Sequence, residues 1–92
     1  MDRRVIFEPQ AFEDYLDWQM PAFMSSGFVA PMINQLIQML ACYGVSDTST
    51  AVTYESEPAW SLHIWGKHHL IYQINDDEIR ILSCQHRKPY VV

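Results

Sequence analysis

The carboxyl-terminal third of the chain, residues 60–90, constrains the fold most. It alternates apolar and polar residues over two runs that are separated by Gly66-Lys67. A third run starts at Glu78, directly after the turn-forming sequence Asn75-Asp76-Asp77. A period of two that is interrupted by glycine and by Asn/Asp clusters is typical of strands joined by tight turns. The sequence therefore predicts an antiparallel β-meander in this region.

The register of the first hairpin decides which side chains share a face of the sheet, because successive residues of a strand point to opposite sides. A short loop of Gly66, Lys67 and His68 places Trp65 opposite His69. The predicted core face then holds Trp60, Leu62, Ile64, Leu70, Tyr72 and Ile74. The other face holds His63, Trp65, His69, Ile71 and Gln73, and a two-residue turn at Asp76-Asp77 adds Arg80, Leu82, Cys84 and His86. A two-residue first loop would instead shift the register by one.

The charge distribution points to the same region. The formal net charge is −5, which argues against a general affinity for nucleic acid, because phosphate binding grows with the number of Lys and Arg contacts. No basic residue lies between Val5 and Gly66, whereas four of the six basic residues follow Gly66, and residues 60–90 contain all four histidines. We therefore expect an acidic helical part, a locally basic end of the sheet, and any chemistry within the meander.

The amino-terminal half predicts one strand and two helices. The run Arg3 to Glu8 is rich in β-branched and aromatic residues and is ended by Pro9, as suits a strand. A helix is predicted from Pro9 to Gln19, with Phe12, Tyr15, Leu16 and Gln19 on one helical stripe. A second helix is capped by Ser25 or Ser26 and ends at Gly44, with the apolar stripe Ile33, Leu36, Ile37 and Leu40.

The polar side of the second helix carries no charge, since its residues are Asn34, Gln35 and Gln38. This side is either a contact for a partner or a second copy of the chain, or an ordinary neutral surface. The stretch Ala51 to Glu57 is ambiguous and could begin a strand that continues past Pro58. The predicted order is β-α-α-β-β-β. We expect one α+β domain over residues 1–92, with a helical hairpin packed on one face of a mostly antiparallel sheet.

Two further features concern the compartment. Cys42 and Cys84 are predicted to be reduced and mostly buried thiols, because no signal peptide is seen. No apolar run is long enough to span a membrane. We expect a cytoplasmic protein that makes no contact with a membrane.

Two segments resemble a known family. FEPQAFEDYLDWQ near the start, and WSLHI with HHLIYQINDDEIRILSCQHR near the end, resemble the YoeB/Txe branch of the RelE/ParE toxins of type II toxin–antitoxin modules. The resemblance implies a RelE/ParE-like fold, a cognate antitoxin protein as partner, and cleavage of ribosome-bound mRNA without a metal or other cofactor. Cleavage of this kind needs a general base, a general acid and a cation near the phosphate.

The family's roles are carried over position by position. The glutamate before the W-S motif corresponds to Glu57 or Glu55, and the arginine of H-R-L-V-Y corresponds to His69. The two arginines of W-S-R-R are replaced by Leu62 and His63. The family's terminal histidine and tyrosine positions are taken by Arg87 and Lys88, with His86 one place earlier and Tyr90 the nearest tyrosine.

The resulting candidate site has catalytic residues Glu57, His63, His69, His86 and Arg87, and RNA-binding residues Trp65, Lys67, Lys88 and Tyr90. Imidazoles are competent bases and acids near neutral pH, and Trp65 could stack on a base or cover a neighbouring chain. Zinc would need three convergent histidines, but adjacent strand residues such as His68 and His69 point oppositely and no known ligand spacing is present.

Two functional hypotheses follow. In the first, the chain is a toxin with Glu57 or His63 as base, His86 as acid, and Arg87, Lys67 and Lys88 holding phosphate. In the second, it is a catalytically degenerate domain of the same fold that binds an antitoxin or a second copy of itself, as the lost arginines suggest. Inhibition of DNA gyrase, as in the ParE branch, would follow from the shared fold alone.

Overall fold

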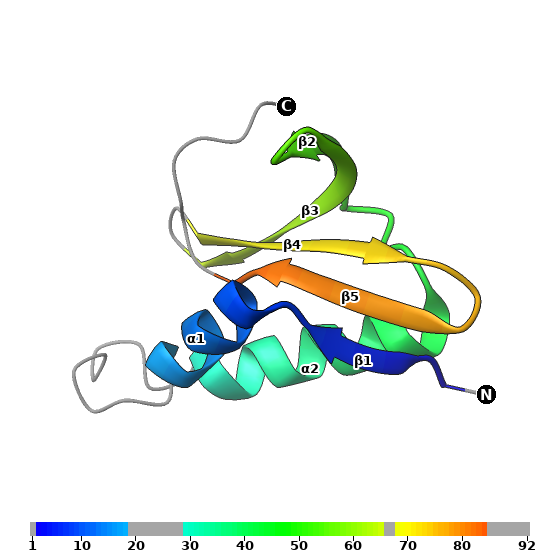
Figure 1. Cartoon of the computed structure of the whole chain (residues 1–92). Helices are drawn as coiled ribbons and strands as arrows, with labels where there is room; N and C mark the ends of the chain where they lie inside the picture. The colour runs from blue at the N-terminus through cyan, green and yellow to red at the C-terminus, as the bar shows by residue number, and fades with distance from the viewer. Residues whose placement is uncertain (1, 19–28, 66–67, 85–92) are drawn as a thin grey trace.

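A five-stranded sheet and two helices form two layers in the computed structural model, which describes residues 2–18, 29–65 and 68–84 (Figure 1). The elements follow the order β1 (Arg4–Phe7), α1 (Pro9–Trp18), α2 (Val29–Tyr43), β2 (Thr50–Tyr54), β3 (Glu57–Trp65), β4 (His68–Ile74) and β5 (Glu78–Ser83). The strand order is β1-β5-β4-β3-β2, in which only the β1–β5 pair is parallel. Both helices lie on one face of the sheet, so the predicted α+β class is confirmed.

The main core lies between this face and the helices, and its sheet side is the predicted one. Leu62, Ile64, Leu70 and Tyr72 are buried there, with Trp60 and Ile74 packed at the margin. Strand β5 adds Ile79 and Ile81. The predicted two-residue turn at Asp76-Asp77 is also confirmed, because Asn75 donates its backbone N–H to the Glu78 carbonyl and its side-chain oxygen accepts from the backbone N–H groups of Asp77 and Glu78.

Helix α2 buries the stripe that the sequence predicts. Ile33, Ile37 and Leu40 are at most 6% exposed, and Ala41 joins them. Gly44 ends the helix with φ at 88°, and its N–H donates to the Leu40 carbonyl. Glycine adopts this left-handed conformation without steric cost, so it is a common helix terminator.

Helix α1 turns a different side to the core than the sequence suggested. Phe12 and Leu16, predicted as core residues, are 48% and 46% exposed, whereas Ala11 and Asp14 are completely buried. The predicted stripe was therefore wrong by about one position, and the real one is Ala11, Asp14 and Tyr15. Phe12 instead lies edge-on to Phe7 of β1. Gln19, the last residue of the predicted stripe, lies outside the described residues.

The ambiguous stretch before Pro58 forms a hairpin, so the sheet has one more strand than predicted. Tyr54 pairs with Glu57, and the two residues between them, Glu55 and Ser56, have φ values of 49° and 68°. Positive φ at both central positions is the signature of a type I′ turn, which favours Asn-Gly. Pro58 lies within β3 opposite Thr53 of the edge strand β2.

Replacing this turn with its preferred residues is expected to stabilise the protein. Glu55→Asn combined with Ser56→Gly should raise the free energy of unfolding by about 1 kcal/mol, because a side chain in the left-handed region costs roughly 1–2 kcal/mol and Asn and Gly tolerate it better. Urea denaturation followed by circular dichroism measures the change. Ser56→Ala keeps the Cβ atom and should give no gain; equal stability of the double variant and the wild type would contradict the turn assignment.

A second, smaller core covers the face of the sheet opposite the helices, here called the outer face. It contains Val52, Tyr54, Ala59 and Ile71, with Leu82 packed against them. In β5 a register shift leaves Leu82 as an extra residue, because Tyr72 pairs with Ile81 whereas Ile71 pairs with Ser83. The extra residue reverses the alternation of sides.

Cys84, predicted on the outer face, therefore lies in the main core. His86, predicted on the same face, lies outside the described residues. The predicted register of the first hairpin was also wrong. His63, not Trp65, pairs with His69, because the pairing shifts between His63 and Trp65 and leaves Trp65 opposite His68.

Candidate active site

Two histidines face each other at one end of the outer face. His63 of β3 pairs directly with His69 of β4, their ring centroids are 5.4 Å apart, and the rings are inclined at 72°. Their sequence neighbours Leu62, Ile64 and Leu70 are buried in the main core, so alternation directs both imidazoles away from the helices. His63 is exposed and His69 is half-buried. Imidazole side chains are common general acids and bases in catalysis.

The next residue pair on the same face of β3 and β4 lies beside the imidazoles. Ser61 of β3 pairs with Ile71 of β4, and both are buried. On the other side of β3, Ser61 pairs with Thr50 of β2, which is exposed. The histidine pair is thus supported by apolar and hydroxyl side chains, with solvent access on the His63 side.

Glu57, predicted as a catalytic base, does not meet the histidines. It is the exposed first residue of β3, whereas His63 lies six residues further along the same strand. At a rise of about 3.3 Å per residue the two are separated by roughly 20 Å of strand. A base and its reacting group must lie within hydrogen-bond reach, so Glu57 and the turn residue Glu55 cannot act together with His63.

The carboxylates of that end line a separate surface hollow of ≈ 440 Å³. Glu8 and Glu13 approach it from the start of α1, and Tyr54 and Glu55 from the β2–β3 hairpin. Negative charge repels phosphate, so this hollow is unsuited to RNA.

Six of the predicted site residues cannot be placed. The side chain of Trp65, and Lys67, His86, Arg87, Lys88 and Tyr90, lie outside the described residues. Their roles stay predictions. Of the nine predicted site residues, the described part of the chain brings together His63 and His69.

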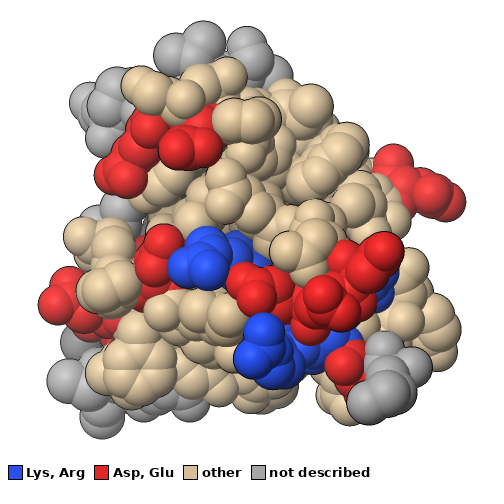
Figure 2. All heavy atoms as spheres, turned by 45° about the vertical axis from the view of Figure 1, so that its right-hand side comes forward, with Lys and Arg blue, Asp and Glu red and all other residues tan. Residues whose placement is uncertain are grey.

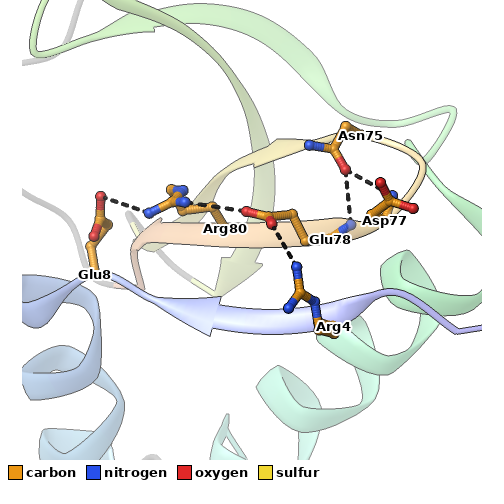
Figure 3. Close-up of polar contacts among 6 residues, drawn as sticks. All are labelled: Arg4, Glu8, Asn75, Asp77, Glu78 and Arg80. Carbon is orange, nitrogen blue, oxygen red and sulfur yellow. Dashed lines mark hydrogen bonds and ion pairs between the residues drawn. The ribbon is translucent and has the colours of Figure 1, made fainter.

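The described arginines are all held by partners within the protein. Arg80 lies between Glu8 and Glu78, at 3.5 Å and 3.2 Å, and Arg4 lies 3.3 Å from Glu78 (Figure 3). Arg3 donates to the backbone carbonyls of Ala41 and Asn75. Figure 2 shows arginine side chains flanked by acidic ones on this side of the molecule. Phosphate contacts are therefore expected from Lys67, Arg87 and Lys88 rather than from the arginines of residues 2–18 and 68–84.

A buried polar group that the sequence analysis missed ties α1 to the end of β5. Asp14 Oδ2 accepts hydrogen bonds from the Ser83 hydroxyl at 3.2 Å and from the Cys84 backbone N–H at 3.0 Å. Ser83 also hydrogen-bonds to Tyr54; burial raises the pKa of the Tyr54 phenol, and this hydrogen bond opposes the rise. The signal was the spacing of Ala11, Asp14 and Tyr15 on one side of the helix.

The two cysteines are reduced, as predicted, but only one is buried. Burial raises the pKa of the Cys84 thiol to about 12. Cys42 is exposed, and its hydrogen bond to the Asp2 carboxylate at 3.3 Å raises its pKa. Both thiols are therefore protonated at neutral pH and are poor nucleophiles.

The described residues contain neither a cluster of metal ligands nor a membrane-spanning helix. No group of three or more His, Cys, Asp or Glu side chains within residues 2–18, 29–65 and 68–84 could hold a metal ion. Among the helices that the structure describes, none is long and apolar enough to cross a membrane.

Comparisons with solved structures recover the same fold. The YoeB dimer from Staphylococcus aureus is 27% identical, with 95% of this chain and 99% of that chain covered and a TM-score of 0.73. The heterotetrameric YoeB–YefM toxin–antitoxin complex from the same organism gives 27% identity, the same coverage and a TM-score of 0.70. A YoeB/ParE toxin from Agrobacterium tumefaciens, 16% identical over 91% of this chain and 98% of that chain, shares the fold with a TM-score of 0.73. No curated protein sequence matches the chain.

The pair of helices on a mostly antiparallel sheet is therefore the fold of the YoeB/ParE-type toxins of the RelE/ParE superfamily. The family is then given by sequence, because the model of the YoeB-like toxins of bacterial type II toxin–antitoxin systems matches residues 7–88. The chain belongs to this family of YoeB-like toxins.

Proposed function

We propose that this toxin is an endoribonuclease that cleaves ribosome-bound mRNA by acid–base chemistry without a metal. The observation that carries the proposal is the His63–His69 pair on the outer face, which the helices leave uncovered. Two imidazoles at one point can supply a neutral base and a cationic donor at the same pH. His69 also occupies the position of the family's H-R-L-V-Y arginine. The guanidinium is thus replaced by an imidazole, which is a cation when it is protonated.

The proposed reaction is an in-line displacement at a phosphodiester. His63 removes the proton from the ribose 2′-hydroxyl, and the 2′-oxygen forms a bond to phosphorus. The bond from phosphorus to the 5′-oxygen breaks, and His86 protonates the leaving oxygen. The products are a 2′,3′-cyclic phosphate and a 5′-hydroxyl. The imidazolium form of His69, together with Lys67, Arg87 and Lys88, stabilises the charge that develops on the phosphate.

The partners proposed for the chain follow from its relatives. The Staphylococcus aureus proteins are a YoeB dimer and a YoeB–YefM complex. We propose an antitoxin protein as the cognate partner of this chain, ribosome-bound mRNA as its target, and a homodimer as an assembly that it can form.

Induction of the chain in bacteria tests this function. The expected result is arrest of growth with specific cuts in cellular transcripts, both prevented by the product of an adjacent antitoxin gene. Normal growth with intact transcripts, at a protein level that immunoblotting confirms, would refute the nuclease.

A second candidate function is favoured by the exposed side of α2. Met39 and Tyr43 are 41% and 84% exposed, and with Gln35, Leu36 and Gln38 they line a hollow of ≈ 380 Å³ that carries no charged side chain. Exposed aromatic and methionine side chains are enriched in protein interfaces. A catalytically degenerate domain that binds an antitoxin or itself would use this side. Size-exclusion chromatography tests it; a monomer that retains no product of a neighbouring gene would contradict it.

A further inference from the structure

We propose that His63 and His69 together bind one divalent first-row transition metal ion, Cu(II) most tightly, as a two-histidine chelate on the outer face. Binding itself is independent of the proposed nuclease function. The regulatory consequence developed below rests on that function.

The distance between the two rings suits a shared metal ion. A histidine nitrogen binds such an ion at about 2.0–2.1 Å, which puts each ring centroid about 3.2 Å from the metal. Two such rings have centroids about 4.5 Å apart at a ligand angle of 90° and about 5.2 Å apart at a tetrahedral angle. The observed separation is 5.4 Å, so small side-chain rotations bring the two nitrogens onto one ion.

The sheet holds the two ligands in place before the metal arrives. His63 and His69 are direct cross-strand partners, and the adjacent pairs Leu62–Leu70 and Ser61–Ile71 fix the backbone beside them. Leu62, Leu70, Ser61 and Ile71 are all buried. The backbone of both ligands is thus ordered before binding, which lowers the entropic cost of forming the chelate.

The chemistry of the ligands selects the kind of ion. Two imidazoles are neutral nitrogen ligands, which suit copper, nickel and zinc, and affinity for such sites rises to a maximum at Cu(II). Mg²⁺ and Ca²⁺ need oxygen ligands. The nearest carboxylate on β3 is Glu57, at the other end of that strand. The exposed side of His63 leaves room for water to complete the coordination shell.

The bound ion would regulate the proposed nuclease. Coordination occupies the lone pair with which His63 would accept the 2′-hydroxyl proton, and it removes the imidazolium form of His69. Transition metal ions would therefore inhibit RNA cleavage, whereas Mg²⁺ would not.

Isothermal titration of the tag-free chain with CuCl₂ and with NiCl₂ tests the proposal. The expected result is one ion per chain, with affinity at least about tenfold weaker in His63→Ala and in His69→Ala. His68→Ala is the matched control, because alternation puts His68 on the opposite side of β4, and it should bind as the wild type does. Electron paramagnetic resonance of the Cu(II) complex should show two nitrogen ligands in the wild type and one in each single variant.

Two outcomes would overturn the metal site: undiminished Cu(II) affinity in both single variants, or an equal loss in His68→Ala. Circular dichroism of each variant separates loss of ligand from loss of fold. Because binding is measured without RNA, ions that bind as described to a protein that cuts no transcript would refute the nuclease alone. Transcripts cut by a chain whose variants bind Cu(II) like the wild type would refute the metal site alone.

Discussion

Replacing Asp14 with alanine is expected to lower the free energy of unfolding by about 3 kcal/mol, which is a large part of the stability of a small protein. The carboxylate is completely buried and accepts from the Ser83 hydroxyl and the Cys84 N–H. Its removal leaves two buried donors without this acceptor, each at a cost of about 1–3 kcal/mol. Urea denaturation of the purified variant measures the loss.

Glu13→Ala is the matched control for this variant. It removes a carboxyl group at the adjacent position, but Glu13 is exposed and, within the described residues, accepts a hydrogen bond at 3.5 Å from Gln10. Glu13→Ala should change the free energy of unfolding by no more than about 0.5 kcal/mol. Equal stability of the Asp14 and Glu13 variants would contradict the structural role assigned to Asp14.

Asp14 also matters for the proposed site because of where its partners lie in the chain. Ser83 and Cys84 directly precede the stretch that carries His86 and Arg87. The buried carboxyl group thus holds the end of β5 to which that stretch is joined in the chain, and a loosened end of β5 is expected to reduce activity as well as stability.

The second large effect is expected on cleavage. His63→Ala should lower the rate of mRNA cleavage by about 10²–10⁴-fold, the usual contribution of a positioned acid or base. His69→Ala should lower it by about 10²–10³-fold, the usual contribution of one group that stabilises charge in the transition state. The fold should tolerate both changes, because His63 is exposed and His69 is half-buried. Cleavage of a ribosome-bound message by purified protein, followed by primer extension, gives the rates.

His68→Ala is again the control, since it removes an imidazole from the same strand without touching the pair on the outer face. It should cleave at the wild-type rate. A fall as large as that of the His63 variant would mean that the pair is not the reactive group.

The parts of the fold that depend on local patterns could be predicted from the sequence. The buried stripe of α2 from Ile33 to Leu40 could be predicted from the spacing of apolar residues alone. The end of α2 could be predicted because Gly44 tolerates a positive φ. The turn after Asn75 could be predicted because an Asn side chain accepts hydrogen bonds from backbone N–H groups that follow it, here those of Asp77 and Glu78. The core face of β3 and β4 follows from alternation.

The remainder depends on contacts between distant residues. One extra residue in β5 moved Cys84 from the outer face into the core, and such a bulge has no clear sequence signal. Asp14 was expected on the surface because a carboxylate is rarely buried without partners, and its partners Ser83 and Cys84 lie about 70 positions later in the chain.

Only part of the candidate site could be predicted, because the site too depends on contacts between distant residues. The pairing of β3 with β4 brings His63 and His69 together, although through a different register than expected. Glu57 was grouped with them because the family resemblance places a catalytic glutamate before the W-S motif, and the turn at Glu55 and Ser56 was not predicted. That turn places Glu57 at the start of β3, far from the histidines.

The proposed nuclease activity of this YoeB-like toxin depends on the His63–His69 pair. The most direct test maps the 5′ ends of one translated message after brief exposure to wild-type protein and to His63→Ala protein, matched for amount and fold. The proposed reaction predicts new 5′-hydroxyl ends within the coding sequence for the wild type and none above background for the variant. The same ends at the same frequency with both proteins would contradict it.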